Sequence, residues 1–298
     1  MKILLFGANG QVGWELQRSL SALGDLVALD RRSPDLCGDL TDLNGIKDTV
    51  QRLAPDVIIN AAAYTAVDKA ESDATAAQLV NAAAPCALAQ AANAIGALIV
   101  HYSTDYVFDG SGSTPWVETD LTGPLNVYGT TKLAGEQLIA SQCPNHLIFR
   151  TSWVYAARGG NFAKTMLRLA QQRESLSVIN DQFGAPTGAD LLADATAHAI
   201  RQVLNRPQDA GTYHLTAAGQ TSWFDYANYV INQQIRSQVA PEIIVKNITP
   251  VATIAFPTVA QRPHNSRLNT AKFQQTFGLQ LAPWQQAARL PVWCAHTH

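Results

Sequence analysis

One stretch near the N-terminus decides the fold: Ile3-Leu4-Leu5-Phe6-Gly7-Ala8-Asn9-Gly10-Gln11-Val12-Gly13. Its four apolar residues are continuous, which is typical of a strand covered on both faces in a parallel sheet. The three glycines that follow predict a sharp turn, a close backbone approach to a pyrophosphate, and tight packing of the first helix on its strand. The N-terminus of that helix supplies free N–H groups and a partial positive charge to phosphates. The stretch therefore predicts a dinucleotide site at the first strand-to-helix turn.

Apolar runs and helical patterns alternate through the first half of the chain. We expect strands at 3–6, 26–29, 57–59, 97–101 and 146–149, and helices at 12–23, 43–53, 74–94 and 128–141. This alternation predicts an α/β fold with a Rossmann-like, doubly wound parallel sheet.

The second half is less regular and richer in proline, which predicts a smaller, mostly C-terminal substrate domain. We expect a dinucleotide-binding domain at residues 1–152, to which about 175–217 returns, because a helical pattern and a strand-like run lie in that stretch. The substrate-binding domain then comprises 153–174 and 218–298.

Composition excludes several classes of protein. Of 298 residues, 47% are hydrophobic and 15% charged, and the net charge is −2, so the chain is not disordered and has no basic footprint for nucleic acid or an anionic membrane. The cysteines are too widely spaced for a disulfide framework and indicate a reducing compartment: Cys37, Cys86, Cys143 and Cys294. Without a signal-peptide core or an apolar run of membrane-spanning length, we expect a cytoplasmic protein whose partner is a small molecule or another protein.

The end of the second strand bears on the choice of cofactor. Asp30 there suits the adenosine ribose 2′-OH of NAD, whereas the adjacent Arg31 suits the 2′-phosphate of NADP, and Arg32 fits a solvated surface. We therefore expect both NADH and NADPH to be used. Segments after the second and third strands are expected to cover the adenine and to lie along the nicotinamide half. The predicted cofactor-binding residues in these segments and the turn are Gly7, Asn9, Gly10, Gln11, Val12, Gly13, Asp30, Arg31, Asp39, Leu40, Ala62, Ala63 and Tyr64.

Three side chains predict carbonyl reduction. Tyr128 and Lys132 lie four residues apart and share one helix face, and a nearby lysine favours the phenolate form of a tyrosine whose ordinary pKa is about 10. Such a pair also arises by chance on exposed helices. Here, however, Thr104 ends an upstream strand and is placed to hydrogen-bond a carbonyl that Tyr128 protonates while a nicotinamide delivers hydride.

At this point the sequence resembles the extended short-chain dehydrogenases/reductases, and within them the dTDP-4-dehydrorhamnose reductases, over essentially the whole chain. Beyond the glycine turn, the resemblance rests on STDYVFDG (103–110), YGTTKLAGE (128–136), RTSWVY (150–155), NF (161–162), DQFGAPT (181–187) and RPHNSRL (262–268). It implies NAD(P)H-dependent reduction of the 4-keto group of dTDP-4-dehydro-β-L-rhamnose to dTDP-L-rhamnose, a donor for cell-surface polysaccharide.

The resemblance also implies roles for single residues. Tyr128 would donate the proton, Lys132 would hold the nicotinamide ribose and tune the phenol, and Thr104 would orient the keto oxygen. Asp105 and Trp153 would contact the sugar nucleotide. Considered alone, Trp153 fits either a flat stacking wall or a residue in the core of a domain interface.

Two further expectations concern charged residues. Arg262 suits a diphosphate clamp, with a structural ion pair as the alternative. The family is associated with Mg²⁺, in some members at a subunit interface, and Glu15, Asp190 and Asp194 are candidate ligands, although surface carboxylates are more often only solvated. We also expect a homodimer.

Two alternatives to a reductase remain open at this stage: another enzyme of the same fold, and a non-catalytic subunit. A nucleotide-sugar epimerase shares the fold and is separated by its lack of net cofactor oxidation. A 4,6-dehydratase is disfavoured because Tyr106, and not a second carboxylate, follows Asp105. A non-catalytic regulatory subunit with this fold is expected to lack the tyrosine and lysine that this chain retains.

Overall fold

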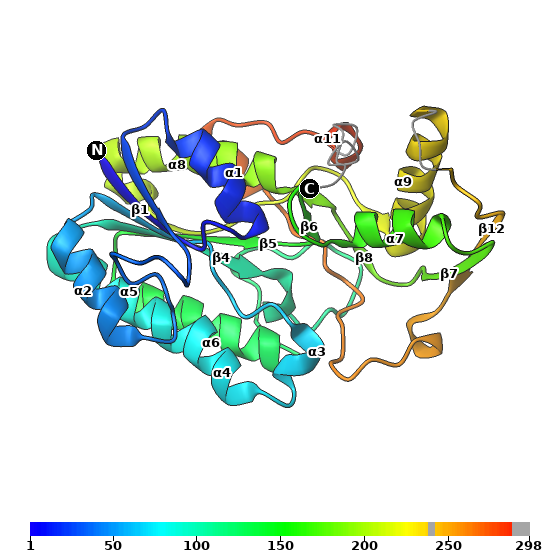
Figure 1. Ribbon diagram of the computed structural model, residues 1–298, viewed down its shortest axis with the longest axis horizontal. Coiled ribbons are helices and arrows are strands. Elements are labelled where there is room, and N and C mark those ends of the chain that lie inside the picture. The colour runs from blue at the N-terminus through cyan, green and yellow to red at the C-terminus, as the bar shows by residue number, and fades with distance from the viewer. Residues whose placement is uncertain (238–241, 288–298) are drawn as a thin grey trace.

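The computed structural model describes residues 1–237 and 242–287 (Figure 1). Within them Cys37, Cys86 and Cys143 are free thiols, as expected. Cys294 and the part of the predicted substrate domain beyond residue 287 lie outside the described residues.

The larger unit is built on a six-stranded sheet in the order β10-β5-β4-β3-β1-β2. All neighbouring strands are parallel. The strands are β1 (Lys2–Phe6), β2 (Asp25–Leu29), β3 (Val57–Asn60), β4 (Leu98–Thr104), β5 (His146–Thr151) and β10 (Gly211–His214). The chain leaves β1 towards β2 on one side and returns to β3 on the other. The order therefore reverses next to β1, and a crevice at the carboxyl ends of β1 and β3 is where such sheets bind ligands.

Helices cover both faces of this sheet (Figure 1). The helices α1 (Gln11–Leu20) and α8 (Ala189–Asn205) pack together on one face, and α2 (Leu43–Leu53), α5 (Ala84–Ile95) and α6 (Val127–Gln142) cover the other. Shorter elements complete this unit: α3 (Val67–Ala70), α4 (Ala74–Gln78), the π-helical turn η1 (Leu79–Ala83), and the 3₁₀ turns η2 (Asp105–Val107) and η3 (Pro207–Asp209). The predicted doubly wound α/β fold is confirmed.

The apolar run of β1 shows why both faces are covered. Ile3 and Leu5 point to the α1 and α8 face, whereas Leu4 and Phe6 point to the α2 and α5 face, and all four are 0% exposed. Burying each such side chain contributes about 1.5–3 kcal/mol. A continuous apolar strand therefore requires a helical layer on either side.

The predicted helix at 74–94 is interrupted by η1. Pro85, at the start of α5, has no N–H to donate to a carbonyl of the preceding turn, and the wider π turn lies directly before it. This turn carries Asn81, which is 1% exposed and bonds the backbone of Tyr64 through both its amide atoms.

The smaller unit lies at one end of the molecule (Figure 1). Its core joins α7 (Phe162–Ala170) and α9 (Trp223–Ser237) to the parallel pair β7 (Ser175–Ile179) and β12 (Asn247–Val251). Shorter elements lie between and beside the two units: β6 (Val154–Tyr155), β8 (Phe183–Gly184), β9 (Thr187–Gly188), β11 (Thr221–Ser222), η4 (Thr253–Ala255) and α11 (Trp284–Ala287). The helix α10 (Ala271–Phe277) returns to the larger unit.

The packing of two elements differs from the expected division of the chain. The strand β7, expected with the larger unit, pairs instead with β12, a partner distant in sequence, so the return to the larger unit begins near α8. The helix α10, expected with the smaller unit, packs Phe273 and Phe277 into the core beside β10. The aromatic rings of Phe149 and Tyr213 in the large sheet contact this helix and help to bury its two phenylalanines.

The packing of α10 generates a stability prediction. Phe273 is 0% exposed, so Phe273→Ala is expected to lower the free energy of unfolding by about 3–5 kcal/mol, measured by urea unfolding. The control Phe256→Ala removes a ring that is 44% exposed and is expected to cost less than about 0.5 kcal/mol. Equal effects of the two variants would contradict this placement of α10.

Candidate active site

The glycine turn after β1 is tightly folded. Gly7 has a φ of +86°, a region that L side chains rarely adopt, and the N–H groups of Gly7 and Ala8 both donate to Leu29 O. A Cβ on Gly13 would lie 2.0 Å from Gly7 O, so α1 approaches the turn as closely as only glycine permits. No side chain caps the N-terminus of α1 at Gly10. Its first N–H groups are therefore available to a phosphate.

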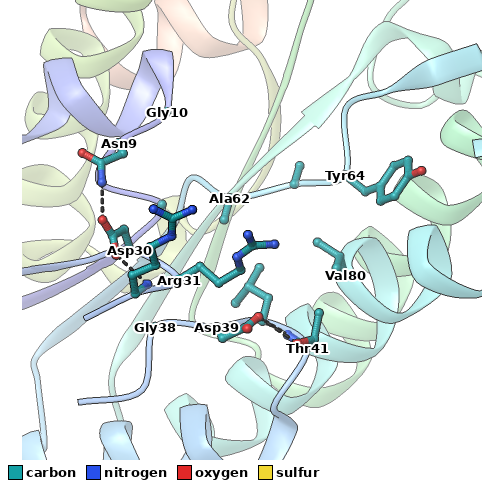
Figure 2. A pocket seen from close by; sticks show the side chains of 14 residues that line it. Asn9, Gly10, Asp30, Arg31, Gly38, Asp39, Thr41, Ala62, Tyr64 and Val80 are labelled. Atoms are coloured by element: carbon teal, nitrogen blue, oxygen red, sulfur yellow. Dashed lines mark hydrogen bonds between the residues drawn. The ribbon is translucent and has the colours of Figure 1, made fainter. Parts of the chain in front are cut away.

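A groove of about 500 Å³ runs from this turn past the end of β2 (Figure 2). Most of the predicted cofactor residues line it: Gly7, Asn9, Gly10, Asp30, Arg31, Asp39, Leu40, Ala62, Ala63 and Tyr64. Gly38, from the segment expected to cover the adenine, also lines it. Sequence reasoning missed Thr41 and Val80, and it placed Arg32 on the surface although this residue also lines the groove. Arg31 and Arg32 make one part of the groove basic, which suits the phosphates of the adenosine half of a dinucleotide.

Asp30 is held at the groove wall by its neighbours. Its Oδ2 accepts a hydrogen bond from the Asn9 side-chain amide, and its Oδ1 accepts one from the backbone N–H of Arg32 at 2.6 Å (Figure 2). The carboxylate and the two adjacent guanidinium groups thus line one groove. This arrangement provides both a hydroxyl acceptor and cationic partners for a phosphate.

A larger cavity of about 800 Å³ continues from the groove, and the two share Gly7, Gly10, Ala62 and Ala63. It brings together most of the other predicted residues: Gln11, Val12, Thr104, Asp105, Tyr128, Lys132 and Trp153. Several further residues line it that were given no role of their own: Thr65, Val67, Tyr106, Phe162 and Trp223. Thr65 lay in the segment expected along the nicotinamide half, and Tyr106 and Phe162 lay in motifs of the family resemblance, whereas Val67 and Trp223 were missed.

Tyr128 lies in the first turn of α6, whose start is fixed from two sides. Asn126 Oδ1 accepts a hydrogen bond from Gly129 N at 2.8 Å and caps the helix. Glu71 Oε1 accepts one from Val127 N at 2.8 Å. Asn126 also donates to Gln261 O at 2.7 Å, which ties this end of α6 to the segment that follows β12.

Burial keeps the phenol of Tyr128 protonated. It raises the pKa of Tyr128 to about 12, the charge of Asp105 acts in the same direction, and a hydrogen bond with Thr104 acts against them. At this pKa the phenol carries its proton in the free protein, and the expectation that Lys132 favours the phenolate stays a prediction. A protonated phenol is the form that a proton donor requires.

Asp105 lies beside this phenol at the end of β4. It is 2% exposed, and burial raises its pKa to about 7, although hydrogen bonds from Ser266 and Thr104 lower it. Thr104 Oγ1 donates to Asp105 Oδ1 at 3.1 Å and accepts from Tyr106 N at 3.1 Å. Hydroxyl, carboxyl and phenol thus form one cluster on the cavity wall.

Lys132 lies one turn further along α6 and is 1% exposed. Its Nζ donates to Tyr102 O at 2.5 Å and lies 3.0 Å from His101 Nε2. Burial lowers its pKa to about 8, while the charge of Glu136 raises it. The amine is therefore close to titrating in the physiological range.

Trp153 lies where the chain passes from β5 to β6, in a strained conformation. Its φ is +50°, which is unfavourable for a bulky residue. Its indole stacks on Trp223, with ring centroids 3.5 Å apart and an interplanar angle of 11°. One face is thus covered by a side chain of the smaller unit, and the cavity wall is the pair rather than a single free ring. Both open interpretations of Trp153 apply in part, since it lines the cavity and packs between the units.

Arg262 is engaged in an ion pair. Its guanidinium donates to both oxygens of Asp68, at 3.0 and 2.7 Å, and to Ala260 O at 3.0 Å. This pair joins α3 to the segment after β12, and it matches the ion-pair alternative that the sequence left open. A diphosphate clamp by Arg262 would require a ligand to compete with Asp68.

The expected metal ligands do not converge within one chain. Arg18 contacts both Glu15, at 3.8 Å, and Asp194, at 2.8 Å, so a cation already balances these two carboxylates. Within residues 1–237 and 242–287, no group of three or more His, Cys, Asp or Glu side chains is placed to hold a metal ion. The set of Glu15, Asp190 and Asp194 therefore stays a prediction, and no chemical step is assigned to Mg²⁺.

Comparisons with known proteins agree with this geometry. A family model described as RmlD substrate binding domain matches residues 1–295. A dTDP-4-dehydrorhamnose reductase of Shigella flexneri is 61% identical over 285 residues, which cover 96% of this chain and 95% of that protein. The protein of the same name from Escherichia coli (strain K12) is 60% identical over the same shares of the two chains.

Solved structures of known proteins are also similar to this chain. A dTDP-4-dehydrorhamnose reductase of Bacillus anthracis in complex with NADP has a TM-score of 0.87, with 34% identity and 96% of each chain covered. A UDP-glucose 4-epimerase of Thermus thermophilus in complex with NAD has a TM-score of 0.79 at 19% identity, covering 98% of each chain. The second likeness shows the fold alone.

No helix among the residues that the structure describes is long and apolar enough to span a membrane.

The Trp153 wall can be tested through Gly184. A Cβ there would lie 2.7 Å from the Trp153 ring, so Gly184→Ala must displace the indole. We expect about a tenfold rise in KM for the sugar nucleotide, because small displacements of positioning groups cost this much, and an unchanged Kd for NADPH. The control is Gly160→Ala, whose Cβ would meet open space. If Gly184→Ala leaves KM unchanged, the wall does not contact the substrate.

Proposed function

This chain belongs to the family described as RmlD substrate binding domain, and from that membership and the geometry of the site we propose that it reduces a 4-keto sugar nucleotide with NAD(P)H. The substrate is dTDP-4-dehydro-β-L-rhamnose and the product is dTDP-L-rhamnose, which places the reaction in dTDP-rhamnose biosynthesis for cell-surface polysaccharide. The observation that carries the proposal is the buried cluster of Thr104, Tyr128 and Lys132 on the wall of a cavity continuous with the dinucleotide groove.

The residues of the groove fit the cofactor. The uncapped N-terminus of α1 and the turn at Gly7 suit the pyrophosphate, and the wall at Asp30 and Arg31 suits the adenosine ribose or its 2′-phosphate. Ala62 and Ala63 line both cavities, which lets the backbone lie along the nicotinamide half. When bound, the reduced nicotinamide supplies the hydride that the keto carbon receives.

The protein supplies the proton and the orientation. Thr104 holds the keto oxygen by a hydrogen bond, and Tyr128 donates its phenolic proton to that oxygen as the carbonyl becomes a hydroxyl. Tyr128 is left as phenolate, which the positive charge of Lys132 stabilises while its amine holds the nicotinamide ribose. Asp105 and the Trp153 wall contact the sugar, and Arg262 approaches the diphosphate if the substrate displaces Asp68.

The alternatives fit less well. A regulatory subunit has no use for a buried tyrosine and lysine at the cofactor site, whereas this chain retains both. The fold is shared with an epimerase and does not separate the two activities. The curated relatives that are about 60% identical are reductases, which favours reduction.

Two further properties stay predictions. A homodimer is supported by the family resemblance. A location in the cytoplasm is supported by the reaction, because a reductase works where its nicotinamide cofactor is regenerated.

The proton-donor role is tested by Tyr128→Phe. This variant keeps the ring but removes the proton, so we expect kcat to fall by at least about 100-fold with little change in cofactor Kd. Tyr213→Phe is the matched control, because it removes a buried phenol that donates to Asp209 O, remote from both cavities. Near-normal turnover of Tyr128→Phe would exclude the role.

The reaction is tested with a panel of 4-keto sugar nucleotides, each assayed for oxidation of NADH and NADPH. We expect one cofactor oxidised per product formed, with dTDP-4-dehydro-β-L-rhamnose the best substrate. Both cofactors are expected to serve, because the groove offers both an acceptor and cations. Product formed without cofactor oxidation would indicate an epimerase. A preference of several hundred-fold in kcat/KM for either cofactor would contradict dual use.

A further inference from the structure

A buried chain of hydrogen bonds connects the cofactor turn after β3 to the catalytic lysine. We propose that this chain runs in one direction, from Ala62 N–H to Lys132 Nζ, so that His101 is a positioning residue that donates to the lysine and favours its uncharged amine. The inference deepens the proposed function, on which the role of Lys132 rests. The chain itself stands on geometry alone.

The links of the chain are short and shielded from water. Ala62 N donates to Asn60 Oδ1 at 3.1 Å, Asn60 Nδ2 lies 3.2 Å from His101 Nδ1, and His101 Nε2 lies 3.0 Å from Lys132 Nζ. Asn60, His101 and Lys132 are each 1% exposed. The parallel register of β3 and β4 places Asn60 directly opposite His101, so the sheet itself fixes the middle link.

The direction follows from the first link. A backbone N–H can only donate, so Asn60 presents its carbonyl oxygen to Ala62 and its NH₂ group to His101. His101 Nδ1 must then accept, which puts the single proton of a neutral imidazole on Nε2, facing Lys132. An ammonium group has three donors and no acceptor. The contact between Nε2 and Nζ is therefore a hydrogen bond only when Lys132 is an uncharged amine.

The protonation states agree with this direction. Burial is the largest cause that holds the pKa of His101 well below its usual range, and any charge on Lys132 acts in the same direction, so the imidazole is neutral and keeps one acceptor nitrogen. Burial also lowers the pKa of Lys132 to about 8. The N–H of His101 Nε2 lowers the pKa of Lys132 further. If the amine were protonated, two hydrogen-bond donors would face each other across 3.0 Å.

The charged groups around Lys132 do not account for an uncharged amine. Glu136, on its own helix, raises its pKa, but that carboxylate is itself paired with Arg150 of β5 at 2.7 Å. Asp105 of η2 acts on the pKa of Tyr128 and is not among the groups that shift the pKa of Lys132. The helix α3 brings two charges, Asp68 and Lys69, which are paired with Arg262 and Asp73, and β5 brings His146, which bonds Cys143 O. The segments α4, η1 and α5 carry no Asp, Glu, Lys, Arg or His.

The chain gives cofactor binding a route to the lysine. Ala62 lines both cavities, so a bound dinucleotide contacts the residue at which the chain begins. With a pKa of about 8, Lys132 can still take up the proton whose charge stabilises the Tyr128 phenolate.

The test measures the pKa of Lys132 directly. The full chain is labelled with ¹³C-lysine, and the Cε signals of its seven lysines are titrated by NMR, with the Lys132 signal identified by its loss in Lys132→Met. We expect Lys132 to titrate at or below about 8, against about 10.4 for an exposed lysine. A value near 10.4 in the free protein overturns the proposal.

Two variants test the direction of the chain. Asn60→Asp offers acceptors to both Ala62 N and His101 Nδ1, which turns the Nε2 lone pair towards Lys132. His101→Gln adds no charge and can present its carbonyl oxygen to Nζ. Each is expected to raise the pKa of Lys132 by at least one unit, a tenfold change in proton affinity. The control His214→Gln replaces a 0% exposed strand histidine that bonds Trp116 O, and it is expected to leave that pKa unchanged.

The outcomes separate the chain from the function. If both variants lower thermal stability but leave the Lys132 pKa within about 0.3 unit of the unmodified protein, His101 only fills space and the proposal fails. If Asn60→Asp does not fold, His101→Gln decides alone. The pH profile of kcat/KM reports on the reaction separately. If catalysis needs the positive charge of Lys132, the pKa of the alkaline limb of this profile equals the Lys132 pKa measured by NMR. A variant that changes the NMR pKa but not the alkaline limb supports the hydrogen-bond chain and contradicts the proposed role of the lysine.

Discussion

A parallel sheet buried on both faces is the constraint on which the rest of this structure depends. The strand β1 exposes none of Ile3, Leu4, Leu5 and Phe6 to water, and the same holds for Val57, Ile58 and Ile59 of β3. With both faces covered by helices, the carboxyl ends of the strands are where polar groups can meet a ligand. Thr104 and Asn60 lie at those ends, and the groove and the larger cavity open there.

The same burial governs the proton chemistry of the site. Desolvation is the largest cause of the pKa shift at Tyr128, at Asp105 and at Lys132, and in each case it favours the uncharged form. The phenol therefore keeps the proton that reduction consumes, and the amine sits near its titration point. A site exposed to water would leave Tyr128 near its ordinary pKa but would lose the coupling between these groups.

The contacts between the two units have a separate basis. Trp153 and Trp223 stack across the boundary, Arg262 pairs with Asp68, and Asn126 donates to Gln261 O. These contacts join α9 and the segment after β12 to the end of β5, to α3 and to the start of α6. The wall of the larger cavity is thus assembled from segments far apart in sequence, which explains why Trp223 carried no recognisable signal on its own.

The sequence by itself determined the elements of the sheet, the glycine turn and the identities of Thr104, Tyr128 and Lys132, because each depends on residues close together in the chain or on a short motif. It also placed Asp30 and Arg31 at the groove. Only the tertiary structure decided which distant residues meet them. His101 faces Lys132 because β4 lies under α6, and Asn60 faces His101 because of the register between β3 and β4. Likewise Arg18 forms ion pairs with Glu15 and Asp194, and β7 pairs with β12. Contacts of this kind depend on packing and desolvation, which no local pattern records.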